Sequence, residues 1–104
     1  MDDFISFVLR HKNWADKTFG INRGVLGRIK HIEKELIELK NNPNGPEEWI
    51  DILMLTLDGL GLIGLSPENI LEELYSKLEK CKNRKWPDWK SADPNKPIEH
   101  IREE

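Results

Sequence analysis

The sequence predicts an all-α fold: a four-helix bundle followed by an extended C-terminal arm. Residues 25–41 place apolar side chains every three or four positions, which is the spacing of one helix face. Residues 46–62 are apolar almost all round, as in the central, buried helix of a bundle. The turn Asn41-Asn42-Pro43-Asn44-Gly45 between them is so short that the two helices are expected to be antiparallel neighbours.

Two further segments flank this predicted helix pair on its N-terminal side. Residues 2–13 have an apolar pattern closer to helix than to strand and predict a short first helix. Residues 13–24 contain two glycines and two large aromatic side chains, Trp14 and Phe19. This composition predicts an irregular connection whose aromatic residues pin it to the core or form a binding wall.

The C-terminal part begins with a clear helix start. Ser66-Pro67-Glu68-Asn69 reads as an N-cap followed by an acidic first turn, and it opens a fourth helix that ends near Arg84. From Trp86 onward, three prolines interrupt any regular period. We therefore expect residues 87–104 to form an arm that docks through Trp86 and Trp89 and then frays.

Length and composition restrict the class of protein. A chain of 104 residues predicts a single domain, residues 1–104, and a net charge of -3 argues against a partner that is a nucleic acid polymer. Cys81 has no second cysteine to pair with, which favours a reducing cytoplasm. The longest apolar run, residues 50–65, is broken by two aspartates and three glycines, so no membrane-spanning segment is expected.

Two acidic pairs carry the strongest chemical signal. Glu35 and Glu38 are three residues apart on the second predicted helix, and Glu48 and Asp51 are three apart on the third. This spacing puts each pair on one face of its helix, one turn apart. Four carboxylates converging between facing helices repel one another unless a cation lies among them. Oxygen ligands of this kind suit Mg²⁺ or a similar hard divalent ion.

A plainer interpretation competes with the metal site. Glu-x-x-Glu by itself usually marks a solvated, charged helix face. Asp51 is harder to explain in that way, because it lies in an apolar helix and a buried acid without a partner is costly. A buried salt bridge from Asp51 to Lys34 or Arg28 remains the alternative to metal.

The order of these residues carries a family resemblance. His31-x-x-Lys34-Glu35-x-x-Glu38, followed by Glu47-Glu48-x-x-Asp51 and Asp58-Gly59, resembles the MazG-like all-α nucleoside triphosphate pyrophosphohydrolase superfamily. The flanking residues resemble its dATP/dGTP pyrophosphohydrolase branch, the MazZ-type proteins found mainly in phages. They are Phe7, Trp14, Thr18-Phe19-Gly20, Arg23, Lys77-Leu78 and Asn83-Arg84-x-Trp86-Pro87.

The resemblance implies metal-dependent hydrolysis of dATP or dGTP to the monophosphate and pyrophosphate. Glu35, Glu38, Glu48 and Asp51 match the family's catalytic metal ligands, with Mg²⁺ or Mn²⁺ as the ion. Relatives are linked to phages that replace adenine by 2-aminoadenine in their DNA. The resemblance also implies a homodimer or homotetramer, acting in the host cytoplasm if the chain is phage-encoded.

Substrate contacts are a second group of candidates, and each has a structural alternative. Lys77 and Arg84 suit phosphate oxygens, or they are solubility charges at a helix C-terminus. Aromatic residues stack on a purine or belong to the core, and Asp58 orients water or pairs with a lysine. The complete set of candidates is Trp14, Phe19, His31, Lys34, Asp58, Lys77, Asn83, Arg84 and Trp86.

Two other functions stay open at this point. One is a house-cleaning pyrophosphohydrolase that removes modified or mixed nucleoside triphosphates. The other is a non-catalytic helical interaction module, in which the acids form salt bridges and the apolar third helix is an oligomer interface.

Overall fold

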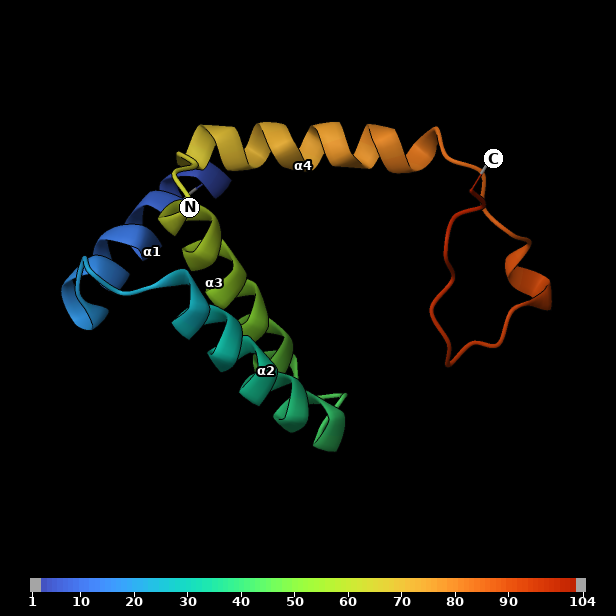
Figure 1. The fold of residues 1–104 in the computed structure, drawn as a ribbon, viewed down its shortest axis with the longest axis horizontal. Coiled ribbons are helices and arrows are strands. Elements are labelled where there is room, and N and C mark those ends of the chain that lie inside the picture. Colours follow the sequence, from blue (N-terminus) through green and yellow to red (C-terminus); the bar gives the residue numbers. More distant parts are fainter. Residues whose placement is uncertain (1–2, 103–104) are drawn as a thin grey trace. The chain divides into compact units, whose positions relative to one another are not determined.

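The structure, a computed structural model, describes residues 3–102 and is built from helices (Figure 1). The four α-helices are α1 Phe4–Phe19, α2 Val25–Asn41, α3 Pro46–Leu62 and α4 Pro67–Lys82, and a short 3-10 helix, η1, spans Trp89–Ser91. No β-strand occurs within residues 3–102. The β-type pairing found there is one isolated bridge, between Lys85 and Ile101. The all-α prediction is therefore confirmed. The chain forms two compact units, Met1–Leu71 and Glu72–Glu104, which we describe separately.

The first helix is longer than the sequence pattern suggested. It begins after Asp3, whose side chain accepts a hydrogen bond from the backbone N–H of Ser6 at 2.7 Å. The prediction that it ends near residue 13 was wrong, because the buried stripe continues through Ala15 and the helix ends at Phe19, with Gly20 as its C-cap. Gly20 has φ +90°, a conformation that favours glycine. The predicted start, residue 2, lies outside the described residues.

Helices α2 and α3 begin and end where the sequence predicted. They run side by side in opposite directions (Figure 1) and make the closest helix pair of the first unit. The indole N–H of Trp49 donates to the carbonyl of Pro43 at 2.9 Å, which ties the start of α3 to the turn before it. The acidic residues of the two helices are thereby brought to the same end of the pair.

The central position of α3 was predicted correctly, but its burial was not. Helix α3 packs against both α1 and α2, yet only Leu57 and Asp58 of α3 are buried in the chain. Trp49, Ile50 and Leu53 remain about half exposed or more. Two neighbouring helices cover only part of a helix surface, so the remaining apolar face of α3 stays open.

The core of the first unit lies where α1, α3 and the first turn of α4 meet. Val8, Leu57 and Ile70 form the buried cluster, with Phe4, Leu60 and Leu65 packed against it. Helix α4 starts as predicted, because the hydroxyl of Ser66 accepts a hydrogen bond from the backbone N–H of Asn69 at 3.1 Å. Within residues 3–102, no single helix qualifies by length and composition as a membrane span, although one bent pair of consecutive helices does when the two are combined.

In the second unit, the chain turns back on itself after α4. The N–H of Ile101 donates to the carbonyl of Lys85 at 2.7 Å in an antiparallel bridge that closes the returning segment. The indole N–H of Trp86 donates to the carbonyl of Cys81 at 2.8 Å, whereas Trp89 is 70% exposed. Of the arm expected to fray, residues 103–104 lie outside the described residues.

Candidate active site

Three carboxylates meet between α2 and α3. Glu35 and Glu38 project from α2, Glu48 projects from the first turn of α3, and one oxygen of each lies within 4.8 Å of the other two. The antiparallel pairing explains this arrangement, since it places the acidic turn of α3 against the later turns of α2. The spacing predicted from the sequence thus brings three of the four acids together.

Glu35 is the buried member of this acidic cluster. Its residue is 8% exposed, and its Oε2 is buried without a hydrogen-bond partner. Its other oxygen, Oε1, lies 3.3 Å from Nε2 of His31. The neighbouring carboxyl of Glu38, burial and the charge of Asp51 together raise the pKa of Glu35, although His31 opposes the rise. Glu35 thus has a buried carboxylate oxygen that accepts no hydrogen bond, and two further acids lie beside it. Together these oxygens are a ligand set that fits a hard divalent cation.

Asp51 is placed differently from the sequence-based expectation. We expected it to be a buried acid, but it is exposed in this chain and lies outside the cluster of three. It faces the same space, however, because its charge contributes to the raised pKa of Glu35 and both residues line one cavity. Glu35, and not Asp51, is therefore the buried acid that requires a partner.

That cavity has a volume of about 190 Å³ and an aromatic wall. Trp14 and Phe19 meet edge to face with ring centroids 5.3 Å apart, and His11 lies 6.1 Å from Trp14. The predicted irregular connection was wrong for residues 13–19, which form the last turns of α1 and carry both aromatic rings; residues 20–24 do connect α1 to α2. An aromatic cavity that adjoins carboxylates is suited to a flat ring carrying a charged substituent.

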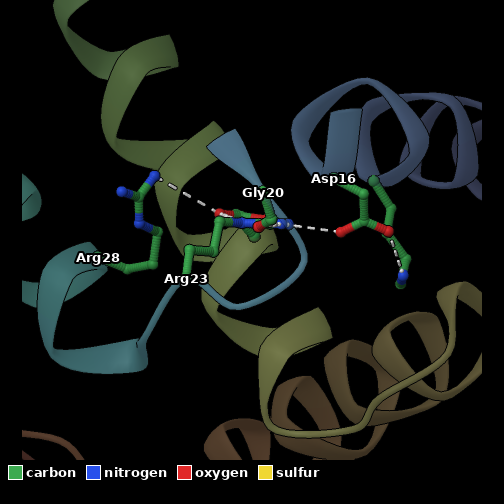
Figure 2. Close-up of polar contacts among 6 residues, drawn as sticks. Asp16, Gly20, Arg23 and Arg28 are labelled. Carbon is green, nitrogen blue, oxygen red and sulfur yellow. Dashed lines mark hydrogen bonds and ion pairs between the residues drawn. The ribbon is translucent and has the colours of Figure 1, made fainter. Parts of the chain in front are cut away.

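Beneath the cavity lies a buried ion-pair network centred on Arg23 (Figure 2). Its Nε and Nη2 donate to the two oxygens of Asp58 at 3.0 and 2.6 Å, and its Nη1 donates to Asp16 at 2.8 Å and to the carbonyl of Gly20 at 2.8 Å. The side chains of Arg23 and Asp58 are each only 5% exposed. Arg28 approaches the same carboxylate, with Nη1 3.7 Å from Oδ2 of Asp58.

This network settles which partner Asp58 has. Sequence reasoning offered a water-orienting role or a lysine of the fourth helix, and the structure supplies the two arginines instead. The bidentate pairing with Asp58 and the bond to Asp16 raise the pKa of Arg23, so the guanidinium is charged at every relevant pH. Arg23 thereby joins the loop after α1 to both α1 and α3.

His11 lies at the junction of two cavities. It lines the aromatic cavity and also a second cavity of about 220 Å³ that is bordered by Arg23 and Asp58. Burial lowers the pKa of His11, Asp58 raises it and Arg23 lowers it again. The net lowering keeps the imidazole neutral at neutral pH, which leaves one nitrogen as a donor and the other as an acceptor.

The other residues predicted to contact the substrate lie in both units. His31 lies beside Glu35, and Lys34 is exposed on α2. Lys77, Asn83, Arg84 and Trp86 belong to the second unit, Glu72–Glu104. Sequence reasoning assigned no site role to Arg23 or Arg28; the available signal was Asp58, an acid in an apolar helix that required a cationic partner.

The four helices and the acidic cluster between α2 and α3 define an all-α protein with a candidate metal site. The fold is similar to that of the cyanophage S-2L MazG-like pyrophosphohydrolase, with a TM-score of 0.76 and 23% identity over 99% of this chain and 97% of that one. That protein was solved with dGDP and three catalytic Mn²⁺ ions per active site. The chain itself belongs to the dATP/dGTP pyrophosphohydrolase family, whose family model matches residues 7–104.

A curated relative extends the same comparison. The Eaa protein of Salmonella phage P22 is 39% identical over 94 residues, which is 90% of this chain and 28% of that protein. The chain thus spans little more than a quarter of this relative's length. The predicted membership of the dATP/dGTP pyrophosphohydrolase branch is confirmed, and the fold is similar to that of a phage MazG-like pyrophosphohydrolase.

Proposed function

We propose that this chain hydrolyses purine deoxynucleoside triphosphates, dATP or dGTP, to the monophosphate and pyrophosphate. The observation that carries the proposal is the cluster of Glu35, Glu38 and Glu48, in which a buried carboxylate oxygen lacks a partner, beside an aromatic cavity. Family membership supports the same reaction. The proposed setting is the cytoplasm, where nucleotide pools are found.

The proposed metal ligands are Glu35, Glu38 and Glu48, with Asp51 completing the set from the edge of the cavity. These residues would hold Mg²⁺ or Mn²⁺, which would supply positive charge for the phosphates and a Lewis acid for the attacking water. The similar cyanophage protein carries Mn²⁺ in its active site, which supports this choice of ion. His31, 3.3 Å from Glu35, orients that carboxylate.

The proposed place of the base is the aromatic cavity. Trp14 and Phe19 offer an apolar wall, and the neutral His11 adds a hydrogen-bonding group. A purine presents more area for such contacts than a pyrimidine does, so burial of the larger ring favours purine substrates. The triphosphate then extends from the cavity towards the carboxylates that line its rim.

The direct test is a substrate panel. The protein is incubated with each of the four dNTPs and NTPs in the presence of Mg²⁺, of Mn²⁺ or of a chelator, and the products are resolved by chromatography. We expect the purine deoxynucleotides to yield monophosphate and pyrophosphate only when metal is present. Release of orthophosphate, turnover in chelator or no turnover of any nucleotide would contradict the proposal.

We also propose a link to 2-aminoadenine DNA, which is tested by adding 2-amino-dATP and oxidised nucleotides to this panel. An enzyme that serves this pathway must remove dATP and convert dGTP to dGMP, yet it must spare the triphosphate of 2-aminoadenine. We therefore expect turnover of dATP and dGTP and little turnover of 2-amino-dATP. Preferred turnover of oxidised or otherwise modified nucleotides would favour a house-cleaning role instead.

We also propose that copies of the chain associate through the open face of α3. Trp49, Ile50 and Leu53 form an apolar stripe on this helix, and each is about half exposed. Light scattering is expected to give a mass above the 12.2 kDa of one chain, and Leu53→Glu should return it to that value. Leu26→Glu, at an exposed position in the first turn of α2, is the control. A wild-type mass of 12.2 kDa would refute the association.

A further inference from the structure

We propose that Arg28 reads the Hoogsteen edge of the purine and gives this site a preference for guanine over adenine. This inference rests on the proposed function, because it assigns a specificity residue to the proposed base cavity. Arg28 lines that cavity together with Trp14 and Phe19.

The first supporting observation is the state of the Arg28 side chain. Its guanidinium lies over the ring of Phe19, with Cζ 5.4 Å from the ring centroid. Its Nε is buried and has no hydrogen-bond partner. A buried donor without an acceptor is costly, so the guanidinium has hydrogen-bonding capacity that the chain itself does not use.

The second observation is how Arg28 is held. Asp58 lies 3.7 Å from Nη1 of Arg28, and Asp58 is itself fixed by two hydrogen bonds from Arg23. Figure 2 shows Arg28 and Asp16 on opposite sides of Arg23. The direction of the Arg28 guanidinium on α2 is therefore set by groups from two other helices, α1 and α3, and from the loop that carries Arg23. A ready-oriented donor loses little conformational entropy when it binds.

The environment favours a base acceptor over a phosphate. Arg28 lies in the aromatic part of the cavity, and the nearby carboxylate of Asp58 offsets part of its charge. An arginine that is partly neutralised in this way still donates hydrogen bonds, but it attracts an anion less strongly. The phosphates are instead expected to bind at the proposed metal site, through the ion that its carboxylates would hold.

The difference between the two purines follows from their edges. Guanine presents two acceptors, O6 and N7, whereas adenine presents the acceptor N7 beside the donor N6. Arginine can only donate, so it matches guanine at both positions and adenine at one. A bidentate contact of this kind discriminates by about tenfold or more in affinity.

The test measures binding of products, so it does not depend on turnover. Isothermal titration in Mg²⁺ compares dGMP, dAMP and 7-deaza-dGMP, which lacks the N7 acceptor, on wild type and on Arg28→Lys. Wild type should bind dGMP about tenfold more tightly than either of the other two. Arg28→Lys keeps the charge but loses the planar fork, so the three affinities should converge.

Arg102→Lys, an exposed arginine of the second unit, is the matched control and should keep the wild-type order of affinities. Equal binding of dGMP and 7-deaza-dGMP by wild type would overturn the proposal, and this arm needs no variant to fold. A uniform loss for all three ligands in Arg28→Lys would also overturn it, because it would indicate a phosphate contact. Either result, combined with normal metal-dependent turnover in the substrate panel, would leave the proposed function intact.

Discussion

Glu35→Gln is expected to abolish turnover without lowering the stability of the metal-free protein. The amide cannot bind a divalent ion as a carboxylate does, and residues that merely support a metal ligand already contribute about 10- to 100-fold to affinity or activity. We therefore expect kcat/KM to fall by more than about a hundredfold.

The stability part of this prediction follows from the pKa of Glu35. The folded state raises this pKa, so ionised Glu35 is less favourable in the fold than in the unfolded chain. Its ionisation therefore costs stability as the pH rises through the raised pKa. Gln removes the ionisable group, and the melting temperature in chelator at neutral pH should stay unchanged or rise.

Thermal unfolding with and without Mn²⁺ completes the experiment. Saturating metal should stabilise the wild type, by about 2.7 kcal/mol at a hundred times the dissociation constant, and Glu35→Gln should show little of this gain. Glu33→Gln, an exposed position on the same helix and outside the acidic cluster, is the control and should behave as wild type. Marked destabilisation of metal-free Glu35→Gln would instead identify a structural ion pair with His31.

Arg23→Met is expected to lower the free energy of unfolding by about 3 kcal/mol, the magnitude seen when one partner of a buried ion pair is removed. Among residues 3–102, the cation left beside Asp58 would be Arg28 at 3.7 Å, and the Asp58 side chain is 5% exposed. Lys12 would remain beside Asp16, 2.9 Å away. Arg23→Lys should cost less, because it retains the charge although it loses the planar fork that contacts Asp58 and Asp16 together.

Urea unfolding of the metal-free protein measures this effect. Lys12→Met is the matched control, since Lys12 belongs to the same network at its exposed edge, where the loss of an ion pair costs about 1 kcal/mol or less. Equal destabilisation by Arg23→Met and Lys12→Met would contradict the central role of Arg23. The aromatic cavity should also loosen in Arg23→Met, because Arg23 ties the end of α1 to α3.

Local signals in the sequence were sufficient for most of the helical framework. Apolar spacing and the Pro43-to-Gly45 turn determined α2 and α3 to the residue, and Ser66 with Pro67 marked the start of α4. The end of α1 was missed, because Trp14 and Phe19 beside a glycine resemble a loop, whereas Ala15 continues the buried helix face. The burial of Ala15 depends on packing against other helices, and the residues next to Ala15 in the sequence do not reveal it.

For the site, the sequence determined the acidic residues and their helical spacing, together with the family that this order of residues indicates. Only the tertiary structure decided which acid is buried: Glu35, expected on a polar face, lies inside, and Asp51, expected inside, lies at the cavity rim. It also decided the partners of Asp58, since Arg23 is 35 residues away in the chain. Burial and long-range ion pairs depend on which surfaces the neighbouring helices cover, and the periodicity of a single helix carries no information about its neighbours.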